Sequence, residues 1–191
     1  MSVTSNFVVS LVKTIKDPSH AAVYEDNYFT SIGLAKYPRS EYGCRYVGTA
    51  RENRVGQPPM KSVKEMSKKT TQRGKLDYVS TDSILVARWK DNRIVTILST
   101  EPMGTVDCYD RAQKRKVPIP CPSAIHMYNN RMGGIDKSDM FTHLYKTPFK
   151  AKRYYMRLLA YLLNLIICKA WILYKMECFA LLENPKPLKD F

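Results

Sequence analysis

The sequence lacks the paired cysteines typical of zinc-binding proteins and a beginning typical of a signal peptide. No two of its five cysteines are spaced as CxxC, and only Cys121 and His126 lie near each other, so zinc-ligand spacing is absent. The odd number and wide scatter of the thiols indicate reduced, mostly buried side chains in an intracellular compartment. Residues 1–6 are polar and uncharged, which is not how a signal peptide begins.

A long uninterrupted apolar run is lacking as well. Residues 158–174 are rich in leucine, isoleucine and aromatic residues, but Asn164 and Lys169 interrupt them. The run is shorter than the roughly 20 residues that cross a bilayer, and a central lysine is costly there. We therefore expect a buried helix of a soluble protein and no membrane partner.

Acidic residues are scarce relative to basic ones. Asp and Glu number 17 against 31 Lys and Arg, which gives the 191-residue chain a formal net charge of +14. Such a surplus favours a polyanionic partner, nucleic acid first and an anionic membrane surface second. The alternative is that the extra lysines form an ordinary solvated surface.

The first quarter of the chain has the pattern of alternating helices and strands. Residues 5–15 predict a helix, and residues 20–25 predict a strand that delivers Asp26 at its carboxyl end. Open α/β sheets place their active sites at that end of their strands. A helix should follow Ser31 and stop before Pro38, because proline lacks the N–H that a helix interior needs.

The middle of the chain predicts β structure between basic segments, and its final third predicts helices. Asp91 and Asn92 have the character of a hairpin turn between two of the strands. In order, we expect a strand at 44–51, a basic irregular segment at 55–75, strands at 76–80, 83–90 and 93–100, a basic loop at 111–116, an extended proline-rich linker at 117–123, a helix from about 136, a break at 146–148 and a long helix at 151–181.

Two acids follow a pair of glycines near residue 134. Asp136 and Asp139 are three residues apart, so on a helix their carboxylates lie on one face near its positive N-terminal end. Such a pair could hold a divalent cation through oxygen ligands. Alternatively, Asp136 could cap the helix by accepting from the backbone N–H of Ser138 or Asp139.

Four segments together resemble the piggyBac family of transposases and the host proteins derived from them. These are DNYFTS at 26–31, GTARENR at 48–54, YNNRMGGIDKSD at 128–139 and the long helix that follows. The resemblance runs from about Phe7 to Lys175. It implies an α/β fold, namely an incomplete ribonuclease H-like (DDE transposase) core with a small antiparallel β insertion and a long C-terminal helix.

The resemblance also implies a domain organisation and a set of catalytic acids. We expect a partial core at 1–54, a basic β insertion at 55–125, and a C-terminal helical part of the core at 126–191. In the family three aspartates bind two divalent metals, Mg²⁺ or Mn²⁺. Asp26 and Asp136 match the second and third catalytic aspartates, and Asp139 matches a nearby fourth acid that would also contact metal.

The family's first aspartate has no counterpart before Asp26, because Asp17 is expected in a turn. The chain resembles an N-terminally truncated member, in which the strand before Asp26 would lack its partner. Two parallel strands alone would make a marginally stable sheet. We therefore expect a DNA-binding, transposase-derived protein without autonomous catalysis. The alternative is a strand-transfer nuclease completed by upstream residues.

The start of the long helix alternates basic and aromatic residues, a pattern that can bind phosphates while a ring stacks on an unpaired base. An ordinary charged helix end with packed tyrosines is the other interpretation. The expected DNA-binding residues are Lys150, Lys152, Arg153, Tyr154 and Arg157, and Tyr154 matches a position where the family often has tryptophan. The resemblance further implies DNA as partner, a homodimer or a related transposase-derived protein, and a nuclear location.

Overall fold

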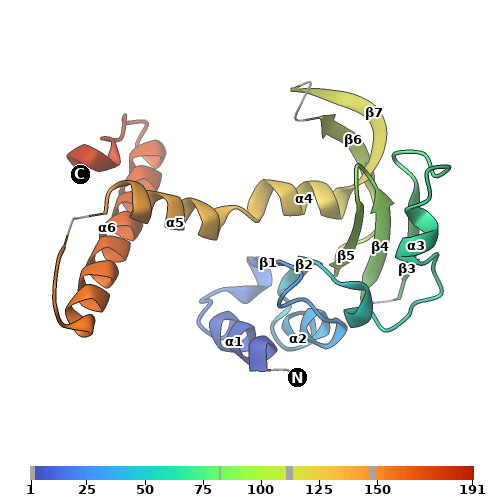
Figure 1. Ribbon diagram of the computed structural model, residues 1–191, viewed down its shortest axis with the longest axis horizontal. Helices are drawn as coiled ribbons and strands as arrows, with labels where there is room; N and C mark the ends of the chain where they lie inside the picture. The colour runs from blue at the N-terminus through green and yellow to red at the C-terminus, as the bar shows by residue number, and fades with distance from the viewer. Residues whose placement is uncertain (1–2, 82, 111–113, 147–148) are drawn as a thin grey trace. The chain divides into compact units, whose positions relative to one another are not determined.

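The computed structural model describes residues 3–81, 83–110, 114–146 and 149–191. Contacts within the chain divide it into two compact units, Met1–Met132 and Gly133–Phe191. Each unit is described by itself (Figure 1).

The first unit is built on a five-stranded sheet with the order β1-β2-β5-β4-β3. Strands β1 and β2 are parallel, and the other neighbours are antiparallel. β1 is an edge strand, with Glu25 opposite Gly48 of β2. The strands are β1 Ala22–Glu25, β2 Arg45–Thr49, β3 Leu76–Ser80, β4 Leu85–Lys90 and β5 Ile94–Ser99.

Both faces of this sheet are covered, because successive side chains of a strand point to opposite faces. Tyr46 packs with helices α1 (Val3–Val12) and α2 (Ile32–Tyr42) on one face. The next residue, Val47, packs on the other face with helix α4 (Ser123–Arg131) and with the two-stranded sheet of β6 (Thr105–Asp110) and β7 (Arg115–Pro122). Figure 1 shows α1 and α2 together on one side of the first unit.

The strands of the expected insertion are antiparallel as predicted, and they continue the core sheet. β5 pairs with β2, so that Val47 lies opposite Ser99. The expected segments 1–54 and 55–125 thus share one sheet and its two hydrophobic clusters. The expectation of only two unsupported strands is wrong for the same reason, although β1 lies at the edge as expected.

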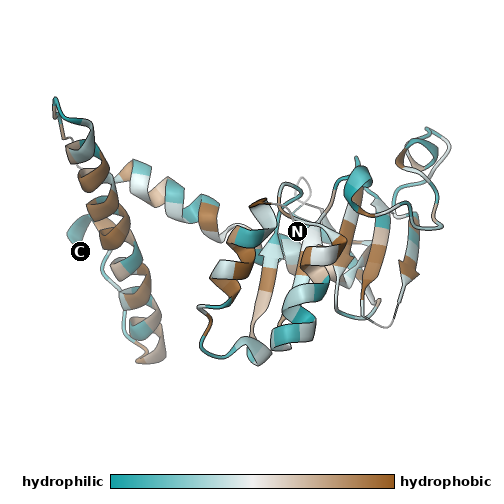
Figure 2. Ribbon diagram, turned by 90° about the horizontal axis from the view of Figure 1, so that it is seen from below, coloured by the Kyte–Doolittle hydropathy of each residue, from teal (hydrophilic) through white to brown (hydrophobic). Residues whose placement is uncertain are grey.

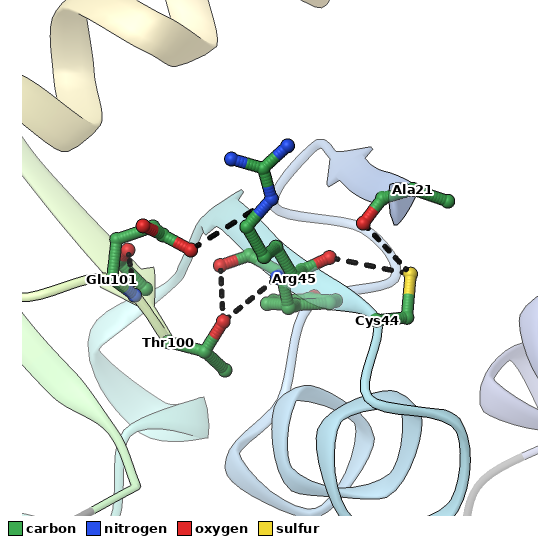
Figure 3. A network of polar contacts seen from close by, with 7 residues as sticks. Ala21, Cys44, Arg45, Thr100 and Glu101 are labelled. Atoms are coloured by element: carbon green, nitrogen blue, oxygen red, sulfur yellow. Dashed lines mark hydrogen bonds and ion pairs between the residues drawn. The ribbon is translucent and has the colours of Figure 1, made fainter. Parts of the chain in front are cut away.

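A polar network ties β1, β2 and the end of β5 together (Figure 3). Cys44 Sγ donates to the Ala21 carbonyl at 3.4 Å. The Tyr46 N–H donates to Thr100 Oγ1 at 2.9 Å, and the Thr100 N–H donates back to the Tyr46 carbonyl at 2.9 Å. Burial raises the pKa of the Cys44 thiol. All five cysteines are buried and free, which confirms the expectation of buried thiols.

Helix α2 continues through Pro38 to Tyr42, contrary to the expected stop before the proline. Ser31 caps its start by accepting from the Leu34 N–H at 3.3 Å. Gly43, in the left-handed region at φ 66°, closes its end. The lost backbone hydrogen bond is offset by tertiary contacts, since Leu34 and Pro38 are buried in the unit.

The second unit consists of α5 (Gly134–Leu144), α6 (Tyr154–Ala180) and a short terminal turn, Leu188–Asp190. Trp171 is its centre: the ring lies 5.1 Å from that of Phe141, and its Nε1–H donates to the Lys186 carbonyl at 2.9 Å. The predicted helix at 151–181 is confirmed with a start three residues later. Thr147 and Pro148, in the expected break, and residues 111–113, in the expected basic loop, lie outside the described residues.

Helix α6 is not the buried helix that its composition suggested. Its buried residues are Asn164, Cys168, Trp171 and Cys178, while most of its leucines and isoleucines are exposed. Figure 2 shows hydrophobic residues along much of its length. In the described part of the chain, α6 is the helix long and apolar enough to cross a membrane by length and composition. The reason for the exposure is that α5 and the terminal turn cover a small part of its surface.

Candidate active site and nucleic-acid interface

Asp26 directly follows β1, at the carboxyl end of a strand as predicted. Its Oδ1 accepts the Tyr28 N–H at 2.8 Å, and its carbonyl accepts the Thr30 hydroxyl at 2.8 Å. These bonds form an Asx turn that leads from the strand into α2. The side chain is exposed, and its second carboxylate oxygen remains available to a ligand.

The turn after Asp26 is held by the segment that follows β2. Arg51 Nε donates to Asn27 Oδ1 at 3.0 Å, and Arg54 Nη1 donates to the Tyr28 carbonyl at 2.8 Å. Gly48 lies against the same turn, where a Cβ would collide with the Thr30 hydroxyl. The DNYFTS and GTARENR segments therefore form one structure, in which two arginines and a glycine hold the Asp26 turn in place.

A buried polar cluster lies beneath this turn. Glu25 is 8% exposed, and its Oε2 accepts the Tyr46 hydroxyl at 2.8 Å. Burial raises the pKa of Glu25 to about 7, a hydrogen bond from Tyr46 lowers it in part, and the charge of Asp26 raises it. Burial also raises the pKa of the Tyr46 hydroxyl, which is 3.1 Å from Thr30 Oγ1.

The burial of Glu25 was not predicted from the sequence. The strand alternation could have revealed it, because Glu25 is the last strand residue and successive side chains point to opposite faces, so that Glu25 points away from the side of the exposed Asp26. Its role here is to connect β1 to β2 through Tyr46 rather than to face the solvent.

Asp136 and Asp139 lie in α5, with Asp136 in the first turn. The helix begins after Gly133, and no side chain caps it, so the capping interpretation of Asp136 is wrong. Both aspartates are exposed, and neither carboxylate makes a hydrogen bond or ion pair with another described residue. At this spacing they share a helix face near its positive end.

The structure brings Asp136 and Asp139 together on α5, within the second unit, whereas Asp26 belongs to the first. Exposed carboxylates with free oxygens are the donors that Mg²⁺ and Mn²⁺ prefer. Asp26, Asp136 and Asp139 are thus of the residue type that a hard divalent cation binds, but no three potential ligands gather into a metal site among the described residues.

The predicted DNA-binding residues lie at the start of α6 and just before it. Tyr154 is the first helical residue and is 80% exposed. Arg153 Nη1 donates to the Tyr155 hydroxyl at 2.6 Å, and Arg157 Nε donates to the Ala151 carbonyl at 2.9 Å. Lys150 and Lys152 precede the helix and are exposed, whereas Lys152 was expected within its first turns.

These contacts separate the members of the expected interface by role. Arg153 holds the ring of Tyr155, and Arg157 holds the backbone at Ala151. Tyr154 presents a mostly exposed ring that contacts Tyr155 edge to face, and the two lysines form no ion pair with a described residue. The arrangement can bind a phosphate backbone and stack one unpaired base.

Comparison with known proteins places this chain among transposase-like sequences. Residues 1–171 match the family described as Transposase IS4. The chain is 32% identical over 155 residues to human PiggyBac transposable element-derived protein 3, covering 78% of this chain and 26% of that protein. It is 28% identical over 183 residues to human PiggyBac transposable element-derived protein 2, covering 91% of this chain and 30% of that protein.

A solved structure has the same fold. The cryo-EM structure of a piggyBac transposase synaptic complex with hairpin DNA matches all of this chain and 38% of that one, with a TM-score of 0.75 and 22% identity. The chain therefore spans well under half the length of each of these proteins.

Proposed function

Because the chain belongs to the piggyBac transposase family, we propose that it is a DNA-binding protein derived from a transposase, with a ribonuclease H-like core. The parallel β1–β2 pair, with Asp26 at its carboxyl end and helices α1 and α2 on one face, supports this core. Its proposed location is the nucleus, in keeping with its partner and with basic clusters such as Lys114–Lys116.

The observation that carries the proposed DNA binding is the exposed Tyr154 ring beside two lysines that form no ion pair within the described ranges, on a chain of net charge +14. Lys150 and Lys152 contact phosphates, and Tyr154 stacks on an unpaired base next to a duplex end. Arg153 and Arg157 hold this surface in shape through Tyr155 and Ala151. A homodimer or a related transposase-derived protein is the proposed protein partner.

Asp26, Asp136 and Asp139 are the proposed carboxylate ligands of Mg²⁺ or Mn²⁺. When bound, such metals activate an attacking water or 3′-hydroxyl and stabilise the leaving oxygen of a phosphodiester. The role of this chain's residues is to place the carboxylates: the Asx turn orients Asp26, and the first turns of α5 carry the other two.

We further propose that these residues alone are catalytically incomplete, since the family resemblance assigns a first aspartate to a strand that has no match here. Asp17 does not replace it, because its carboxylate is engaged with Ser19 and His20 in a turn. The second candidate function is a DNA strand-transfer nuclease completed by residues outside this chain. The unpartnered carboxylates of Asp136 and Asp139 favour it.

DNA binding is tested by fluorescence anisotropy with a labelled duplex that ends in a short single-stranded overhang. Affinity should fall steeply with salt, with a slope of roughly 0.9 per phosphate contact. Lys150→Gln/Lys152→Gln should reduce that slope by about 2, whereas Lys13→Gln/Lys36→Gln, which removes the same charge elsewhere, should leave it unchanged. Binding that is undetectable at physiological salt would refute the proposed function.

The ring and the acids need separate tests. Tyr154→Ala should weaken binding to the overhang by about 1–3 kcal/mol and spare the blunt duplex, because stacking needs an unpaired base. Nicking of the duplex in Mg²⁺ or Mn²⁺, lost in both Asp26→Asn and Asp136→Asn, would favour the nuclease. Nicking that survives both substitutions would come from a contaminant.

A further inference from the structure

A basic hollow of about 480 Å³ lies in the first unit, between α3 (Val63–Met66) and the loop that leads to β3. It is lined by Lys61, Glu65, Met66, Lys68, Thr70, Thr71, Gln72 and Lys75. We call these residues the lysine hollow.

The loop that forms the lysine hollow is tied firmly to the sheet. The Gly74 N–H donates to the Lys90 carbonyl at 2.7 Å, and the Lys90 N–H donates to the Lys75 carbonyl at 2.9 Å. Arg73 pairs with Asp91 at 2.6 Å. Gly74 has φ +90° and approaches β7 so closely that a Cβ would lie 2.8 Å from Ile119. The backbone that carries the lysines is therefore already in position before any ligand binds.

The positive charge of this region is offset only in part from within, because its one acid, Glu65, lies near Lys68 and Lys61. Residues 61–75 contain five lysines and one arginine but a single acid, Glu65. Glu65 Oε2 accepts the Ser62 N–H at 2.7 Å as part of a capping box, and this bonding lowers its pKa. None of the five lysines forms an ion pair with a carboxylate within the described ranges. Three of them, Lys61, Lys68 and Lys75, line the hollow, and their combined positive charge favours an anion.

We propose that the lysine hollow binds the phosphodiester backbone of nucleic acid, as a contact surface additional to the start of α6. Lysine ammonium groups bind phosphates as point charges, and threonine and glutamine side chains are frequent phosphate contacts. This proposal rests on the proposed function only in taking DNA as the polyanion that binds. The hollow contacts phosphates and presents no helix or strand that could enter a DNA groove and contact base edges. Its contribution to affinity is therefore independent of the DNA sequence.

The lining argues against two other kinds of ligand. Sites for small organic molecules are mostly lined by hydrophobic and aromatic side chains, whereas this hollow has Met66 as its one apolar lining residue. Amphipathic helices that bind membrane surfaces combine basic residues with apolar side chains that enter the lipid. Between residues 61 and 75, all of which are described, no large hydrophobic side chain is exposed.

Lysine footprinting is the first test. The intact chain is acetylated with and without a 20-bp duplex, and labelling is read by mass spectrometry. Lys61, Lys68 and Lys75 should be labelled several-fold more slowly with DNA, while Lys13 and Lys36 of the same unit should not change. Protection at Lys150 and Lys152 alone would overturn the lysine hollow and leave the proposed function standing.

The other possible protection patterns in this experiment also distinguish the two surfaces. Protection of the lysine hollow alone would support it and refute the α6 interface, and no protection anywhere would refute both. If vesicles containing phosphatidylserine protect these lysines and the duplex does not, the surface binds membranes and the proposal fails.

The salt dependence of affinity is the second test. Lys61→Gln/Lys68→Gln/Lys75→Gln should lower the slope of log affinity against log salt by about 2 to 3, since each phosphate contact contributes roughly 0.9. The matched control is Lys13→Gln/Lys16→Gln/Lys36→Gln, which removes three charges elsewhere in the unit. Equal slopes for the two triple variants, with unchanged circular dichroism spectra, would overturn the proposal.

Discussion

The buried carboxyl of Glu25 should make the stability of the first unit depend on pH. Its Oε2 accepts the Tyr46 hydroxyl, and its Oε1 has no hydrogen-bond partner among the described residues. Burial raises its pKa from the ordinary value of 4.5 to about 7, which the Tyr46 bond reduces in part and the adjacent Asp26 charge increases. A carboxyl in this environment is more stable protonated than ionised.

The sign and size of the effect follow from the difference between the two states. Below pH 4.5 both states carry the proton, and the full stability is present. Between pH 4.5 and 7 the unfolded chain loses the proton while the folded chain keeps it, so stability falls as pH rises. At about 1.4 kcal/mol per pH unit, the loss amounts to roughly 3 kcal/mol by pH 8.

Urea unfolding at a series of pH values between 5 and 8, followed by tryptophan fluorescence, measures this loss. Glu25→Gln cannot ionise, so its free energy of unfolding should rise relative to the wild type by about 3 kcal/mol across that range. The matched control is Glu41→Gln, because Glu41 is exposed. Parallel profiles for wild type and Glu25→Gln would refute the assignment of a raised pKa to this buried group.

Three further outcomes are expected. Gly48→Ala should destabilise the first unit by about 1–3 kcal/mol in urea unfolding, because the new Cβ collides with the Thr30 hydroxyl; an unchanged midpoint would contradict this close approach. Burial raises the pKa of the Cys121 thiol to about 12, so an aromatic disulfide reagent should label it at pH 8 only after denaturation, and rapid native labelling would argue against its burial. Trp171→Phe removes the donor to the Lys186 carbonyl and should speed proteolysis of the C-terminal turn, a change that limited trypsin digestion detects; an unaltered digestion rate would count against the role of this bond.

Local features of the candidate site were predictable from the sequence because they depend on neighbours in the chain. The apolar run before Asp26 predicts a strand that ends at the acid, and β1 ends at Glu25. The hairpin at Asp91 and Asn92 joins β4 to β5 as predicted. The spacing of Asp136 and Asp139 predicts a shared helix face, and both lie in α5.

Other features of the site depend on contacts between distant segments. Arg51 and Arg54 hold the turn at residues 26–31 from 24 and 26 residues away. Nothing in the local pattern distinguishes these arginines from ordinary surface charges. Glu25 likewise reads as one more exposed acid until Tyr46 and α2 are packed against it.

The sequence by itself determined most of the strands and helices, the excess of positive charge and the family, because periodicity, composition and motif spacing are properties of consecutive residues. It did not predict β6 or α4, and it predicted a linker where β7 lies. Tertiary structure alone decided that β5 pairs with β2, that α2 continues through Pro38, and that α6 leaves most of its apolar surface exposed. An alternating pattern states which face of a strand is apolar but not which strand lies beside it. The strand partner and the tolerated proline depend instead on the free energy of burying side chains from separate parts of the chain.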